Sequence, residues 1–217
     1  MPVLLILSSC NSKTYLPETF SQEVVAKFGG EVSISNLKND SNQSVLDLTL
    51  TQINLDSSAV NATGSLLALQ AFENLEEGAN YDLVQVNIES GSLTRSKMTS
   101  FAYSLSDLEK VSKNWAFLEE YFGNELTESI EQLYAFYDPT IFTQQDVGTF
   151  ILDFKTLDAK ETFKSNNLIG FQIGYLTNNQ KAIMFLVQKE FEKASAQFVF
   201  IFKYDEETPL IAGVSTI

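Results

Sequence analysis

The stretch KAIMFLVQKEFEKASAQFVFIFKY, residues 181–204, decides the fold of the second half of the chain. Two runs rich in apolar residues, residues 181–191 and 196–204, are each predicted to form a β-strand, and Phe198, Phe200 and Phe202 recur with a period of two in the second run. The polar pair Glu192-Lys193 between the two runs predicts a hairpin turn. Two more strands of the same antiparallel meander are expected over residues 169–176 and 210–217.

Upstream of the meander, the apolar residues recur at helical spacing. Ser106 or Asp107 can cap a helix that extends to about Phe122. A second helix is predicted over residues 125–137 and ends before a proline, and a short helix is predicted around residues 147–157. The glycines at positions 170 and 174 are interpreted as places of sharp curvature or close packing within their strand.

The first half is predicted as a smaller layer of the same kind. A short helix, two alternating strands that resemble a hairpin, a helix packed on them and two further strands follow one another along residues 21–105. The expected fold class is therefore α+β, with two modules over residues 21–105 and 106–217. In each module, helices are expected to pack on an antiparallel sheet, and the sheet of the second module is expected to curve like a cone.

Composition excludes several functions. A net charge of −14 repels phosphate backbones, which argues against nucleic-acid binding. The chain contains no histidine, which removes Ser-His-Asp and Cys-His nucleophile systems and His-ligated metal sites. A single cysteine excludes an internal disulfide. The acidic clusters lack the alternating ligand spacing of a calcium loop. We therefore expect no metal, no cofactor and no enzymatic activity.

The N-terminal residues Leu7-Ser8-Ser9-Cys10 resemble the lipobox of bacterial lipoproteins, in which the cysteine becomes the lipidated N-terminus. The resemblance implies a short or truncated signal peptide over residues 1–9, lipid attachment at Cys10 and a tether over residues 10–20. The sequence departs from the lipoprotein pattern because no Lys or Arg precedes the apolar run. In the alternative interpretation, residues 3–7 form a buried strand and Cys10 is a core thiol.

Helices followed by a meander that ends in Phe198-x-Phe200-x-Phe202-Lys203 and an acidic turn resemble the nuclear transport factor 2-like superfamily. The resemblance covers residues 106–217 and implies a curved sheet that wraps helices into a cone. Enzymes of this superfamily use polar residues inside the cone, and the residues that could line its mouth here are Tyr134, Tyr137 and Asp138. Asp138 would then be a base; the favoured alternative is that Asp138 is a turn residue and the tyrosines belong to the core.

These features predict a bacterial cell-envelope lipoprotein that is held at a membrane by its lipid and has a binding or scaffolding role. Its partner would be another envelope protein or a small apolar ligand. The alternative is a small-molecule binding protein or enzyme that uses an apolar cone cavity with Asp and Tyr side chains. A soluble cytoplasmic interaction domain is a third possibility.

Overall fold

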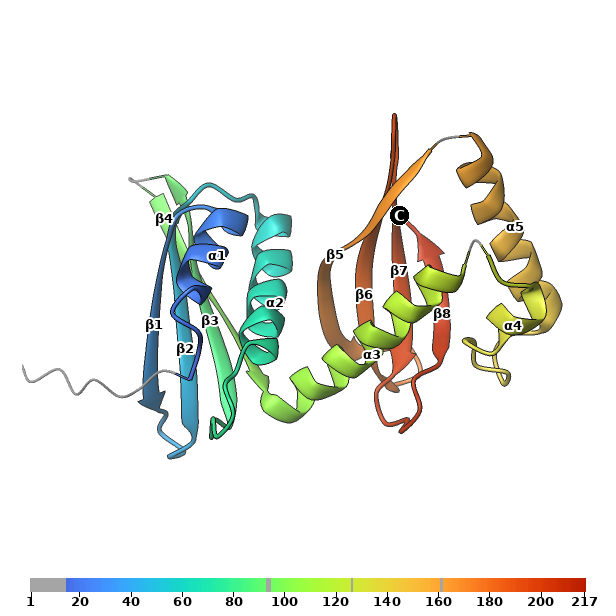
Figure 1. Ribbon diagram of the computed structural model, residues 1–217. Coiled ribbons are helices and arrows are strands. Elements are labelled where there is room, and N and C mark those ends of the chain that lie inside the picture. Colours follow the sequence, from blue (N-terminus) through green and yellow to red (C-terminus); the bar gives the residue numbers. More distant parts are fainter. Residues whose placement is uncertain (1–14, 93–94, 126, 161) are drawn as a thin grey trace, which may run out of the picture.

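The computed structural model describes residues 15–217 except residues 93–94, 126 and 161, and it contains helices and two four-stranded sheets (Figure 1). The first half consists of α1 (Phe20–Phe28), β1 (Glu31–Lys38), β2 (Ser44–Ile53), α2 (Ser57–Glu73), β3 (Leu83–Ser92) and β4 (Arg95–Ser104). The second half consists of α3 (Leu105–Asn124), α4 (Ile130–Tyr134), α5 (Gln144–Lys160), β5 (Phe163–Tyr175), β6 (Lys181–Phe191), β7 (Ser195–Lys203) and β8 (Ile211–Thr216). The predicted α+β class, with two modules, is confirmed.

The first sheet, in the order β1-β2-β3-β4, is mixed rather than antiparallel. Strands β2 and β3 are parallel, with Leu46 opposite Val84 and Leu48 opposite Val86, whereas the two outer pairings are antiparallel. The expectation of an antiparallel sheet was wrong for this module. Because α2 carries the chain back to the end of the sheet where β2 began, the next strand must run in the same direction.

Helix α2 lies between the two sheets (Figure 1). It contacts β3 and β4 of the first sheet on one side and β5 of the second sheet on the other. Leu67, Ala68 and Ala71 are completely buried in it. A helix with buried apolar residues on two of its sides is stable only when both of these sides are covered. The two halves of the chain therefore share one hydrophobic core.

The second sheet, in the order β5-β6-β7-β8, is antiparallel throughout, as predicted for the meander of strands from residue 169 to residue 217. Helix α3 crosses one face of this sheet, and its Trp115 ring lies 5.9 Å from that of Phe185. Phe185, Phe200 and Phe202 are completely buried beneath the helix. The space between α3 and the sheet is thus occupied by aromatic side chains.

The helix predicted over residues 125–137 is much shorter, because local hydrogen bonds interrupt it. The carbonyl of Asn124 accepts hydrogen bonds from the backbone amides of Thr127 and Glu128, which turns the chain after α3. Ser129 and Gln132 then form a reciprocal capping box that starts α4 at Ile130. In contrast, α5 and β5 are both longer than their predicted counterparts.

Candidate functional site

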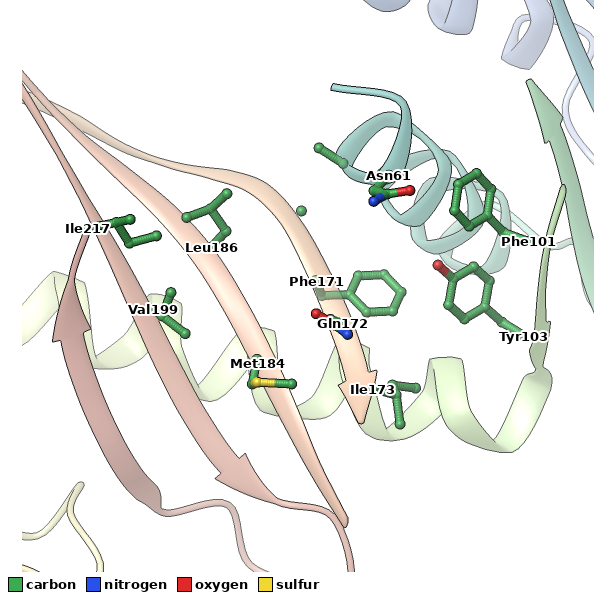
Figure 2. Close-up of a pocket in the computed structure, with 12 residues that line it drawn as sticks. Asn61, Phe101, Tyr103, Phe171, Gln172, Ile173, Met184, Leu186, Val199 and Ile217 are labelled. Carbon is green, nitrogen blue, oxygen red and sulfur yellow. The ribbon is translucent and has the colours of Figure 1, made fainter. Parts of the chain in front are cut away.

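A groove with a volume of about 530 Å³ lies where the N-terminal part of α2 and strand β4 meet the second sheet (Figure 2). This volume falls within the range of about 300–1,000 Å³ that is common for small-molecule sites. Its wall is formed by residues of both halves of the chain: Asn61, Ala62, Phe101, Tyr103, Gly170, Phe171, Gln172, Ile173, Met184, Leu186, Val199 and Ile217.

Close packing of β5 against α2 fixes the two sides of the groove relative to each other. A Cβ atom at Gly170 would lie 3.0 Å from the Cα atom of Ala62 and 3.0 Å from the Oγ atom of Ser65, so only glycine fits without displacement. The Oγ atom of Ser65 accepts a hydrogen bond of 3.0 Å from the backbone N–H of Phe171. The close-packing interpretation of Gly170 therefore agrees with the structure.

The groove is mostly apolar and carries no charged side chain. Phe101 and Tyr103 of β4 face Phe171 of β5, and the rings of Tyr103 and Phe171 have their centroids 5.3 Å apart (Figure 2). Met184, Leu186, Val199 and Ile217 form the opposite side. Such a surface favours ligands that are uncharged and largely apolar, because a charged group would lose its hydration here without gaining an ionic partner.

Three polar side chains in the groove wall are available for hydrogen bonds to a ligand. Within the described part of the chain, the side chains of Asn61, Tyr103 and Gln172 make no hydrogen bond to protein. Burial raises the pKa of the Tyr103 hydroxyl to about 12, so this group stays protonated at neutral pH and can donate a hydrogen bond. Tyr103 is half-buried, whereas Asn61 and Gln172 are exposed, so all three polar groups are accessible to a ligand. These three groups can therefore orient a ligand by hydrogen bonds.

A second polar cluster lies on the opposite face of the second sheet, beneath α3. The hydroxyls of Tyr121 and Tyr137 are 2.9 Å apart, and the hydroxyl of Tyr121 also donates to Glu125 at 3.4 Å. Glu125 in turn forms an ion pair of 2.5 Å with Lys189, and both side chains are only 1% exposed. Burial raises the pKa of Tyr121 and of Tyr137, so both phenols remain neutral.

The three residues that the sequence analysis placed at the mouth of a cone do not form one site. Tyr137 belongs to the buried cluster, whereas the hydroxyl of Tyr134 donates to the carbonyl of Phe142 at 3.0 Å. Asp138 forms an ion pair with Lys203 and accepts hydrogen bonds from Thr140.

Asp138 is poorly suited to act as a base. Burial alone would raise the pKa of its carboxyl, but hydrogen bonds from Lys203 and Thr140 outweigh that effect and leave the pKa below its ordinary value. A carboxylate that is held in its charged form accepts a proton less readily. Asp138 and the two tyrosines are not part of the groove wall.

Other sequence-based expectations concern the N-terminus and metals. The lipobox-like residues, including Cys10, lie outside the described residues. Across the described residues, no helix is long and apolar enough to span a membrane. Within that same part of the chain, no group of three or more Cys, Asp or Glu side chains is arranged to hold a metal ion.

Sequence reasoning missed most of the groove because its walls come together only in the tertiary structure. Asn61 and Tyr103 belong to the first half of the chain, whereas Phe171 and Met184 belong to the second. The pair of glycines in IGFQIGY was the one local signal, since it indicated that β5 approaches another element closely.

Comparisons with known proteins give little information. No family model matches the chain, and no curated protein matches it. A solved structure described as "Structure of Bdellovibrio bacteriovorus Bd1075" is similar at a TM-score of 0.35 and 13% sequence identity, over 87% of this chain and 69% of that chain. A similarity at this level carries no argument about fold or function.

Proposed function

We propose that this chain is a non-catalytic binding protein whose ligand is a small, uncharged and largely apolar molecule. The observation that carries the proposal is the groove between α2, β4 and the second sheet, whose mostly apolar wall also carries three polar side chains that make no hydrogen bond within the described residues. Pockets of this kind, with few and convergent polar groups, are the usual sites of small-molecule binding.

The proposed function does not include catalysis in the groove. Tyr103 is the only titratable side chain in the groove wall, and burial moves its pKa away from neutrality. General acid–base catalysis works best with a group whose pKa lies near the working pH. We therefore assign binding rather than catalysis to the groove.

The groove is also preferred to a cone cavity as the ligand site. Phe185, Phe200 and Phe202 occupy the space beneath α3, which leaves the ligand to the groove on the other side of the sheet. A relationship of residues 106–217 to the nuclear transport factor 2-like superfamily remains a proposal, supported by a helix across a four-stranded antiparallel sheet.

A pair of methionine substitutions tests the ligand site. Met184→Trp adds a large ring inside the groove, whereas Met98→Trp adds the same ring at an exposed position outside it. We expect the neutral dye Nile red to bind the wild type and Met98→Trp alike and to bind Met184→Trp at least tenfold more weakly. Equal dye binding by the two variants would remove the groove as the ligand site.

The location of the protein is a separate proposal, which rests on the resemblance of Leu7-Ser8-Ser9-Cys10 to a lipobox. We propose a lipoprotein of the bacterial cell envelope that is anchored by acyl chains on Cys10, since two or more chains hold a protein stably at a bilayer. Mass spectrometry of the protein from the membrane fraction should show an N-terminus at Cys10 with added lipid. An unmodified full-length protein in the cytosol would contradict this proposal.

A further inference from the structure

The ion pair between Lys189 and Glu125 is the most deeply buried charged feature of the described residues. Both side chains are 1% exposed, and the Nζ atom of Lys189 lies 2.5 Å from an oxygen of Glu125. A buried ion pair is weak evidence for stability, because removing both charges from water is costly. Its presence between α3 and the sheet, where aromatic side chains fill most of the space, therefore points to a chemical role.

The amide of Asn166 lies beside this pair. Strands β5 and β6 place Asn166 directly opposite Lys189, and side chains in such a pair share a face with Cβ atoms about 4.5–5.5 Å apart. The neighbours of Asn166 point to the other face, where Asn167 donates to Ser165. The Oδ1 atom of Asn166 is buried and, within the described residues, accepts no hydrogen bond.

Two aromatic rings lie close to the Lys189 side chain. The Nζ atom of Lys189 lies 5.9 Å from the ring centre of Phe122 and 5.5 Å from that of Phe163. The same two rings and Asn166 line one shallow depression at the surface. The Lys189 amine therefore has a carboxylate in contact with it and a carboxamide opposite it in the strand pair, and the burial of Lys189 and Glu125 strengthens their electrostatic interaction.

We propose that Lys189 and Asn166 form an intramolecular isopeptide bond, with Glu125 as the proton-transfer group. Glu125 takes one proton from the Lys189 ammonium, and the neutral amine then attacks the Cγ atom of Asn166. The bond between Cγ and Nδ2 breaks, and one further proton moves from the attacking nitrogen to Nδ2, which leaves as ammonia. The products are a neutral amide, ammonia and a protonated Glu125, so no oxidant or other reactant is needed.

Tyr121 is the positioning residue of this reaction. Its hydroxyl donates to the Glu125 oxygen that does not contact Lys189, and it is itself held by the hydroxyl of Tyr137. This contact keeps the second carboxylate oxygen directed at the amine. The bond would join the two longest strands of the second sheet in a chain whose single cysteine cannot provide an internal disulfide.

Peptide mass spectrometry of the purified full chain tests the proposal. Trypsin cannot cleave after an acylated lysine, so we expect residues 165–181 to appear linked to residues 182–193, with Lys189 uncleaved. The linked species should be lighter than the sum of its two peptides by about 17 Da, the mass of one ammonia. Separate, unlinked peptides with cleavage after Lys189 would overturn the proposal.

Two controls separate this bond from other modifications. A succinimide at Asn166 would also remove about 17 Da, but the loss would stay within residues 165–181 and would count against the proposal. Asn166→Ala removes the electrophile and should abolish the linked species. Asn167→Ala, on the outer face of the same strand, should retain it. Because the wild-type protein supplies the decisive result, a variant that fails to fold does not weaken the test.

Discussion

The packing of β5 against α2 can be tested by comparing Gly170→Ala with Gly174→Ala. A methyl group at Gly170 would lie 3.0 Å from a backbone atom of Ala62, which cannot move without displacing α2. The same methyl group at Gly174 would lie 3.3 Å from the terminal methyl of Met184, which can rotate away. Both variants reduce the freedom of the unfolded chain equally, so this gain of about 0.4–1 kcal/mol cancels in the comparison.

The remaining difference in stability between the two variants measures the steric overlap between β5 and α2. Overpacking a rigid contact costs about 1–3 kcal/mol, and a chain of this size loses about 2–4 °C of melting temperature per kcal/mol. We therefore expect Gly170→Ala to melt about 2–12 °C below Gly174→Ala in a circular dichroism melt. Urea denaturation should likewise show that Gly170→Ala is less stable than Gly174→Ala. Equal melting temperatures would show that the two halves of the chain are not packed as closely as described.

Three further tests address single polar groups. Ser65→Ala leaves a buried backbone N–H of β5 without an acceptor, and we expect a loss of about 1–3 kcal/mol by urea denaturation; an unchanged midpoint would contradict this. Tyr121→Phe should cost about 1–2 kcal/mol because it breaks a buried hydroxyl pair, whereas Tyr103→Phe should change stability by less than about 0.5 kcal/mol yet weaken ligand binding. The pKa of Asp138 lies below its ordinary value of 3.8, so its contribution to stability is complete above about pH 4 and is lost as the pH falls through the lowered pKa. Acid denaturation should therefore be shallower in Asp138→Asn, and identical acid profiles would refute this assignment.

The second sheet was predictable from sequence because its strands are apolar runs separated by short polar turns. From Ile183 to Phe191 every second side chain is buried, and the predicted bounds of this strand match the structure. Local rules sufficed here, since an antiparallel meander pairs neighbours in the sequence. The start of α3 was predicted less well, because Ser106 or Asp107 was expected as its cap, whereas Ser104 caps the helix.

The first sheet was less predictable because its pairing depends on the path of α2. Residues 45–50 and 83–88 alternate in the same way whether the strands run parallel or antiparallel. The length of the intervening helix indicates a crossover connection, but only the tertiary structure shows that β2 and β3 become neighbours. The same helix also separates the groove walls in the sequence, which explains why local patterns did not reveal the binding site.

The burial pattern of β6 contains one residue that does not fit an apolar core. Within β6, Ile183, Phe185 and Val187 are buried at every second position, and Lys189 continues the same phase. A lysine on the core face of a strand contradicts the local pattern, and such contradictions concentrate at functional or strained sites. The carboxylate of Glu125 compensates the positive charge of Lys189. This ion pair does not explain why a lysine occupies the position, or why Asn166, whose Oδ1 atom accepts no hydrogen bond within the described residues, lies opposite Lys189. The proposed isopeptide bond would account for Lys189, Glu125 and Asn166 together. Cleavage by trypsin after Lys189 would show instead that Lys189 and Glu125 form an ordinary ion pair beside the Asn166 amide.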